Sequence, residues 1–264
     1  MITAALALTS VALANISVAD AAAPSHPNDG LGRANHADKT IFPPNTKAKA
    51  NAGATCPNGY VALTYDDGPG GYGTSQSDTM GPLVDALTAN GLHATFFDVG
   101  NEEEANPAVV QKAIAAGMDF GDHTYWHVYN AANLWTTDHL KKDIGDTSLL
   151  HEWLGGRPEK WFRPPYDQWV SSAALPAGMT ELTWTLDDHV YQGRTANQIT
   201  DVYGLARNGD IVLSHVGYQS EVAAVPLIAA KLKAHGLCSG RIVPSSSPTT
   251  NAWGESFNAT TGAW

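Results

Sequence analysis

Residues 63–69 read LTYDDGP, so an apolar run passes directly into two adjacent aspartates and a Gly-Pro turn. Neighbouring like charges repel one another, and something has to stabilise each of them. An ordinary acidic turn in solvent is one interpretation of Asp66 and Asp67. The other is a functional site, in which a metal ion holds one carboxylate and a cationic side chain holds the other.

The sequence around this stretch alternates between short apolar runs and helical patterns. We expect strands at 60–65, 94–98, 118–121, 161–162, 182–186, 210–215 and 241–243, and helices at 78–90, 106–117, 138–154, 196–205 and 221–235. Such an alternation predicts an α/β domain with a parallel sheet, either open or closed as a barrel. In both architectures ligands bind at the carboxyl ends of the strands.

Polar groups follow four of these predicted strands at the same rim: Asp66 with Asp67, His123 with His127 in DHTYWH, Arg163 in RPPY, and His215 in IVLSH. On one helical turn, the spacing of the histidine pair puts both imidazoles on one face, as metal chelation requires. Each feature alone has a simpler explanation, such as a solvated histidine pair or an extended proline loop. Their agreement at four strand ends indicates a site.

Hydrolysis assigns a role to each group. Two imidazoles and one carboxylate form a three-ligand set with an open position, which is typical of catalytic zinc. The other aspartate is then available as a general base on water, with Arg163 holding its charge, and His215 is the candidate acid for the leaving group. We interpret four other histidines as structural and leave His189 undecided; the four are His93, His139, His151 and His235.

Composition excludes some partners. The 264 residues include 15 basic and 26 acidic side chains, a net charge of −11, which argues against nucleic acid and anionic membranes. After the N-terminus, no apolar run is long enough to span a membrane. A neutral polysaccharide is compatible, and eight Trp and nine Tyr could stack on sugars, although core packing is their more common role.

The chain ends differ from the periodic region. Residues 1–21 are apolar and end in Ala19-Asp20-Ala21, which predicts a signal peptide and a secreted, extracellular protein; an N-terminal core helix is the alternative. Residues 22–55 are expected to form a flexible linker, 56–243 the catalytic domain, and 244–264 a Ser/Thr/Pro-rich tail. Cys56 and Cys238 bracket the domain, which favours a disulfide over two free buried thiols.

At this point a resemblance to a known family is evident. TYDDGP resembles the T-F-D-D-G-P motif of the NodB-homology polysaccharide deacetylases, carbohydrate esterase family 4. HTYWH (123–127), RPPY (163–166) and LSH (213–215) are similar to the family's H-[ST]-x-x-H, R-x-P-Y and L-x-H motifs. The resemblance covers residues 56–243 with four motifs in order. The segments around Cys56 and Cys238 also resemble secreted acetylxylan esterases of this family.

The resemblance implies a distorted (β/α) barrel of about seven strands and the removal of acetyl groups from sugars. It implies that Asp66 is the base, oriented by Arg163, and that His215 is the acid. The implied metal ligands are Asp67, His123 and His127, holding a divalent ion that is most often Zn²⁺, with Co²⁺ or Ni²⁺ as alternatives. It also implies that the Tyr166 backbone N–H stabilises the oxyanion and that Leu213 helps to line the acetyl pocket.

One motif departs from the family pattern. The family's D-x-x-D-W corresponds here to Asp187, Val190 and Tyr191, following Trp184. Only the first aspartate is retained, so the usual carboxylate support of the acid histidine is missing unless Asp188 replaces it from a shifted position. We expect Trp184, Asp187 and Tyr191 to contribute to the substrate pocket.

The sequence therefore predicts a secreted, monomeric, metal-dependent polysaccharide deacetylase. Acetylxylan and N-acetylglucosamine polymers such as chitin are the leading substrates, and peptidoglycan follows them. The alternative from another class is a catalytically impaired carbohydrate-binding protein on the same scaffold. A metallohydrolase of small amides is disfavoured by the predicted signal peptide and disulfide.

Overall fold

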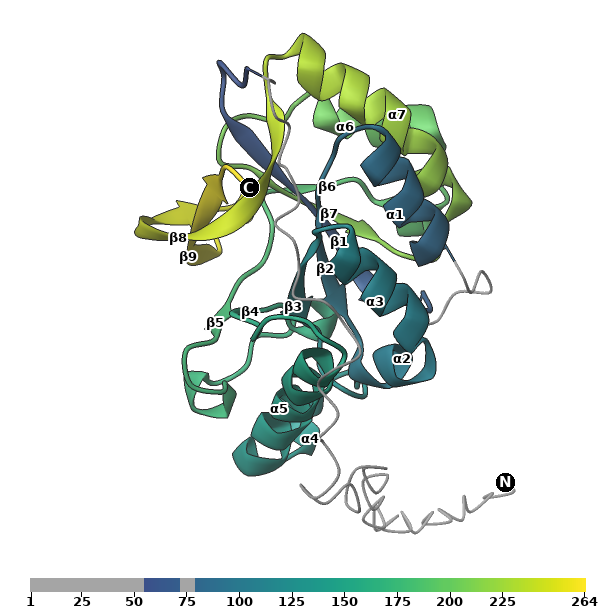
Figure 1. Cartoon of the computed structure of the whole chain (residues 1–264). Helices are drawn as coiled ribbons and strands as arrows, with labels where there is room; N and C mark the ends of the chain where they lie inside the picture. The colour runs from purple at the N-terminus through teal and green to yellow at the C-terminus, as the bar shows by residue number, and fades with distance from the viewer. Residues whose placement is uncertain (1–54, 72–78) are drawn as a thin grey trace, which may run out of the picture. The chain divides into compact units, whose positions relative to one another are not determined.

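A computed structural model of the chain describes residues 55–71 and 79–264 (Figure 1). The predicted signal peptide and nearly all of the predicted linker lie outside the described residues. Parallel strands form one continuous path in the order β5-β4-β3-β2-β1-β7-β6. Their bounds are β1 Tyr60–Gly68, β2 Thr95–Asp98, β3 Asp119–Asp122, β4 Trp161–Phe162, β5 Thr180–Glu181, β6 Leu186–Asp187 and β7 Ile211–His215.

The two edges of this path are joined by the segment between β5 and β6. The Leu182 N–H donates to the Phe162 carbonyl at 2.9 Å, and the Thr185 N–H donates to the Ile211 carbonyl at 2.8 Å. The chain thus leaves one edge strand and reaches the other within three residues. This exchange nearly closes the sheet, and the predicted distorted barrel of about seven strands is confirmed. The single strand predicted at 182–186 is wrong, because the exchange of partners divides it.

Helices cover the sheet between the strands (Figure 1). They are α1 Met80–Ala89, α2 Gly100–Ala105, α3 Pro107–Ala115, α4 Ala131–Leu134, α5 Thr137–Trp153, α6 Ala196–Tyr203 and α7 Gln219–Ala234. All five predicted helices are confirmed to within a few residues. The sequence missed α2 and α4, which are too short to show an apolar period. None of the described helices is both long enough and apolar enough to cross a membrane.

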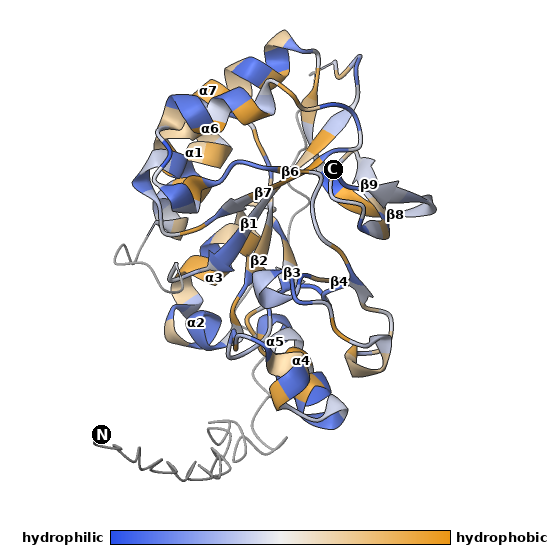
Figure 2. Cartoon of the chain, turned by 180° about the vertical axis from the view of Figure 1, so that it is seen from behind, coloured by the Kyte–Doolittle hydropathy of each residue, from blue (hydrophilic) through white to orange (hydrophobic). Residues whose placement is uncertain are grey.

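The core lies between the sheet and these helices. Its centre combines β1 side chains with the apolar faces of α1 and α7, such as Leu63, Leu83 and Ile228, which are all buried. Hydrophilic residues occupy the other faces of α1, α6 and α7 (Figure 2). Amphipathic helices packed on a buried parallel sheet are the arrangement that the alternating pattern predicts.

The chain after Val243 is not a tail. It continues β8 (Cys238–Thr250) and returns as the antiparallel strand β9 (Ser256–Gly262), which projects to the left in Figure 1. Phe257 and Ala259 on β9 are buried against the barrel interior with Ile242. The prediction of a tail failed because it rested on the Ser, Thr and Pro content of the segment. Alternating Thr and apolar residues also suit a half-buried strand.

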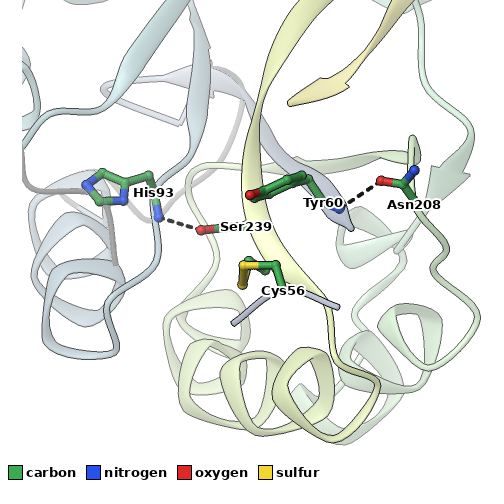
Figure 3. The surroundings of a disulfide bond; sticks show 6 residues. Cys56, Tyr60, His93, Asn208 and Ser239 are labelled. Carbon is green, nitrogen blue, oxygen red and sulfur yellow. Dashed lines mark hydrogen bonds between the residues drawn. A yellow bond between two sulfur atoms is a disulfide. The ribbon is translucent and has the colours of Figure 1, made fainter. Parts of the chain in front are cut away.

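The predicted disulfide is confirmed and fastens both ends of the domain (Figure 3). Cys56 and Cys238 are joined with their Cα atoms 5.5 Å apart, beside the start of β1, where Tyr60 pairs with Cys238. The Tyr60 N–H donates to Asn208 Oδ1 at 2.9 Å, and the His93 N–H donates to Ser239 Oγ at 3.1 Å. The first and last parts of the barrel are therefore held together at one end.

Candidate metal and catalytic site

The end of β1 brings both aspartates into one site. Successive strand residues normally face opposite sides of a sheet. Here the pairing of β1 with β2 shifts register between Asp66 and Gly68, and Asp67 has a left-handed backbone with φ 67°. A bulge combined with a left-handed residue turns the second carboxylate back toward the first. Two adjacent acids can therefore face one centre.

Arg163 holds Asp66. Its Nη1 donates to Asp66 Oδ1 at 2.6 Å and to Thr64 Oγ1 at 2.9 Å, and its Nη2 donates to the Thr183 carbonyl at 3.3 Å. The arginine is fully buried and Asp66 is 3% exposed. A buried carboxylate needs such a hydrogen-bonded cation, because neither charge has water to stabilise it. The structure thus places the predicted pair in contact.

Close packing sets the direction of the guanidinium. Its carbon lies 4.1 Å from the centre of the Phe97 ring and 5.6 Å from that of Trp184. Phe97 in turn lies over Gly121 of β3, where a Cβ atom would come within 2.4 Å of the ring. Glycine at this point of β3 leaves room for the aromatic ring that supports Arg163. The sequence did not predict this contribution of Gly121.

The histidine pair lies in a loop and not on a helical turn, so that part of the prediction is wrong. After β3, Thr124 and His127 take left-handed backbone conformations with φ 67° and 50°. Asp122 Oδ1 accepts the Thr124 N–H at 2.8 Å, and Thr124 Oγ1 accepts the His127 N–H at 3.0 Å. Short side chains that bond to nearby backbone favour turns over helices, and here they bring the two imidazoles together.

Asp67, His123 and His127 present three ligand atoms to one point. Asp67 Oδ1 is 3.1 Å from His127 Nε2 and 3.5 Å from His123 Nε2, and the two nitrogens are 3.2 Å apart. A tetrahedral zinc ion with bonds of about 2.0–2.2 Å has its ligand atoms about 3.3–3.6 Å apart. The separation of 3.5 Å lies within this range, and the other two are shorter than it by only 0.1–0.2 Å, so the three atoms can hold such an ion with a small adjustment.

The surroundings of His123 and Asp67 also favour metal binding by these atoms. His123 Nδ1 lies 2.6 Å from the Arg163 carbonyl oxygen, so the ring proton belongs on Nδ1 and Nε2 keeps a lone pair for a metal. Burial alone would raise the pKa of Asp67. The neighbouring imidazoles of His123 and His127 outweigh burial and hold that pKa well below its usual value, so the carboxylate is ionised.

A second set of residues in the described part of the chain has comparable spacing: Glu103, His151 and Glu159, all buried. Glu103 Oε1 lies 3.0 Å from His151 Nδ1, so a carboxylate already pairs with this imidazole. Burial raises the pKa of Glu159 to about 7. This agrees with the interpretation of His151 as structural, and only the first set lies beside a buried base and its arginine.

His215 ends β7 opposite Asp66, with which it is paired in register. Its Nδ1 is buried and has no hydrogen-bond partner among the described residues. Asp188 is close enough to His215 for an electrostatic interaction. The oxygens of Asp188, however, accept hydrogen bonds from Ser214 Oγ at 2.5 Å and from the Val190 N–H at 3.0 Å. The altered D-x-x-D-W motif therefore leaves the candidate acid without a carboxylate on its ring.

The remaining predicted pocket residues lie on β7 or beside it. Leu213 is buried on β7, opposite Thr64 of β1. The Tyr191 ring meets the His215 ring edge-on at 5.3 Å, and its hydroxyl donates to Asp187 Oδ2 at 3.0 Å. Asp187 thus orients Tyr191 and contacts His189 Nδ1 at 3.0 Å rather than His215.

Tyr166 lies on the other side of the metal ligands. It has a left-handed backbone with φ 57° and its ring packs 4.8 Å from the ring of His127. It therefore stands beside the ligand set, as the prediction of an oxyanion contact requires. Besides Gly121, the sequence did not predict Thr64, which shares Arg163 with Asp66, or the tip of the β8–β9 hairpin, which was assigned to a tail.

Comparison with known proteins places this site in a family. A polysaccharide deacetylase family model matches residues 53–182. A peptidoglycan-N-acetylglucosamine deacetylase of Bacillus cereus is 32% identical over 186 residues, covering 67% of this chain and 83% of that protein. A bifunctional xylanase/xylan deacetylase of Cellvibrio japonicus is 30% identical over 199 residues, covering 74% of this chain and 28% of that protein.

Solved structures agree with these matches. A family 4 carbohydrate esterase from Streptomyces lividans, in complex with acetate, superposes with a TM-score of 0.63 and 34% identity. The match covers 70% of this chain and 94% of that one. The chain thus belongs to the polysaccharide deacetylases of carbohydrate esterase family 4. It spans only part of some curated relatives, for example 37% of a Listeria monocytogenes peptidoglycan deacetylase.

Proposed function

We propose that the protein is an exported, metal-dependent deacetylase that hydrolyses acetyl groups on a polysaccharide. The observation that carries this proposal is the buried Asp66–Arg163 pair directly beside Asp67, His123 and His127. A structural metal site has no need of an additional buried carboxylate at 3.9 Å from a ligand nitrogen, whereas hydrolysis needs a base there.

The residues divide the reaction between them. When bound, a divalent ion, with zinc as the first candidate, would lower the pKa of water and polarise the acetyl oxygen. Asp66 takes a proton from the attacking water, whose oxygen forms the new bond to the acetyl carbon. The bond from that carbon to the sugar oxygen or nitrogen breaks, and His215 gives its proton to the departing atom. Arg163 pairs with the base and directs it at the water.

Relatives point to two kinds of substrate. They include a xylan deacetylase and several peptidoglycan deacetylases. We place an acetylated neutral polysaccharide, such as acetylxylan or a chitin-type polymer, ahead of peptidoglycan, because the net charge of −11 disfavours an anionic wall polymer. Export is supported by the predicted signal peptide and by the disulfide.

The competing function is a carbohydrate-binding protein whose catalysis has decayed. The observation in its favour is the unpartnered Nδ1 of His215. Against it stand the intact base, arginine and three metal ligands, which binding alone would not require.

Acetate release tests the proposal. The purified protein is given acetylxylan, chitin oligosaccharides or peptidoglycan, first after chelation and then with zinc restored. We expect zinc-dependent release from at least one polymer, loss of release in Asp66→Asn, and unchanged release in the control Asp85→Asn, whose carboxylate is exposed. Zinc-loaded, folded protein that releases no acetate from any polymer would support the binding protein instead.

A further inference from the structure

Exposed aromatic side chains gather around the site. Among the described residues six Tyr and Trp side chains are more than a third exposed: Tyr129, Trp153, Tyr166, Trp169, Tyr191 and Trp253. Five of them connect to the site: the Tyr129 ring packs 5.2 Å from Tyr166, Tyr166 packs on His127, and Tyr191 packs on His215. Trp169 and Trp253 join it through the hairpin tip, whereas Trp153 ends α5. Such a concentration of apolar rings in water indicates a binding surface.

Glu255 joins the tip of the β8–β9 hairpin to the active-site loop. Its carboxylate accepts the Trp253 indole N–H at 2.5 Å and the Asn251 Nδ2 at 2.7 Å, both within the tip. It also accepts the indole N–H of Trp169 at 3.4 Å. Trp169 lies three residues after Tyr166, so one carboxylate orients an indole ring from each segment.

Ring contacts also connect the tip to the arginine that holds the catalytic base. The Trp253 ring lies 5.9 Å from the Trp184 ring, and Trp184 in turn lies 5.6 Å from the Arg163 guanidinium that holds Asp66. Trp253 nevertheless keeps 50% of its surface exposed and Trp169 keeps 39%. The two indoles are therefore anchored at their N–H edges while much of their surface remains available to a ligand.

This combination fits a sugar ring. A pyranose has an apolar face of C–H groups, which suits a fixed indole, and hydroxyls at its edge, which suit nearby carboxylates and amides. Glu255 and Asp167 supply those polar groups, and Asp167 also accepts from Thr183 Oγ1 at 3.1 Å. These two carboxylates, Glu255 at the hairpin tip and Asp167 in the active-site loop, disfavour an anionic ligand and leave a neutral or cationic saccharide as the match.

We propose that Trp253 and Trp169, oriented by Glu255, form a platform that binds a sugar ring of the substrate chain beyond the unit whose acetyl group is hydrolysed. The platform rests on the proposed function and specifies its substrate as an extended oligosaccharide or polymer rather than a single acetylated sugar. Trp169 lies within residues 53–182 that match the family model, whereas Trp253 and Glu255 of the hairpin lie outside them.

Substrate length provides the test. Rates of acetate release from acetylated xylo-oligosaccharides or chito-oligosaccharides are compared from the disaccharide to the hexasaccharide. For Trp253→Ala we expect KM for the hexasaccharide to rise about 3- to 10-fold, the loss of one aromatic contact, while kcat and the KM for the disaccharide stay unchanged. Trp253→Phe should retain most of the hexasaccharide affinity, because it keeps an aromatic face.

Trp153→Ala is the matched control, since it removes an indole of comparable exposure at the end of α5, 60% against 50% for Trp253. It should leave KM unchanged at every length. Equal KM changes for the disaccharide and the hexasaccharide, or no change in Trp253→Ala, would overturn the platform while leaving the proposed function in place. A general effect of Trp253→Ala on folding would lower kcat and kcat/KM for substrates of every length. It would also lower the melting temperature of the variant.

Failure of the proposed function is detected separately. If the wild-type protein releases no acetate from any oligosaccharide, hexasaccharide binding to wild type and to Trp253→Ala is measured by calorimetry. Weaker binding by the variant supports the platform on a binding protein, and equal binding refutes it.

Discussion

Replacing Arg163 with methionine should destabilise the protein through the charge that it leaves behind. The arginine is fully buried and its Nη1 lies 2.6 Å from Asp66 Oδ1, while Asp66 is itself 3% exposed. Methionine fills much of the same volume but supplies no cation and no hydrogen bond. The carboxylate of Asp66 then remains in the interior without its partner.

The size of the effect follows from that burial. Removing one member of a buried ion pair costs about 3–5 kcal/mol in unfolding free energy. For a domain of this size about 2–4 °C of melting temperature corresponds to each kcal/mol, so we expect a fall of roughly 6–20 °C. Acetate release should fall by about 10²- to 10⁴-fold, as expected when a general base is no longer positioned.

A double-variant cycle separates charge from packing. Unfolding in urea is measured on metal-free protein for Arg163→Met, Asp66→Asn and the combination, with the disulfide intact. The combined variant should be more stable than Arg163→Met, because no buried charge is left unpaired, and the coupling should exceed about 1 kcal/mol. Additive losses, or a combined variant less stable than Arg163→Met, would show that the pair does not act as we describe.

Three further perturbations test other parts of the structure. Metal analysis should find one tightly bound ion per chain, lost in Asp67→Asn and retained in Glu103→Gln; two ions would mean that the second buried set also binds. Exchanging both Cys56 and Cys238 for serine opens a loop with a sequence separation of 182 residues and should cost about 5 kcal/mol in urea unfolding, whereas an unchanged midpoint would contradict the bridge. Burial raises the pKa of Glu181 from 4.5 to about 7, so the native state binds more protons than the unfolded chain between those values. Stability should therefore decline as pH rises from about 4.5 to 7, and melting curves of Glu181→Gln should show a smaller decline.

Local sequence patterns predicted most of the barrel and nearly every member of the site. Apolar runs alternating with helical periods are properties of neighbouring residues, and they predicted five helices and most of the strands. Because parallel strands end at one rim, the positions of Asp66, His123, Arg163 and His215 along the chain were enough to predict that they meet. The cysteines at the two ends of the domain likewise predicted their pairing.

Other features depend on pairing between distant segments. No local pattern shows that residues 182–185 exchange β4 for β7, or that the chain after Val243 returns as β9, since each is decided by which strand offers free backbone groups. The failure at the hairpin concealed Trp253 and Glu255, and with them the proposed platform.

The sequence by itself determined which acidic, imidazole and guanidinium groups follow the strand ends and in what order. Tertiary structure alone decided their directions. A register shift and a left-handed Asp67 turn two adjacent carboxylates to one centre, and a left-handed loop brings the two imidazoles together. These backbone conformations are unfavourable in isolation and persist because packing around Arg163 and the bonds of the loop hold them.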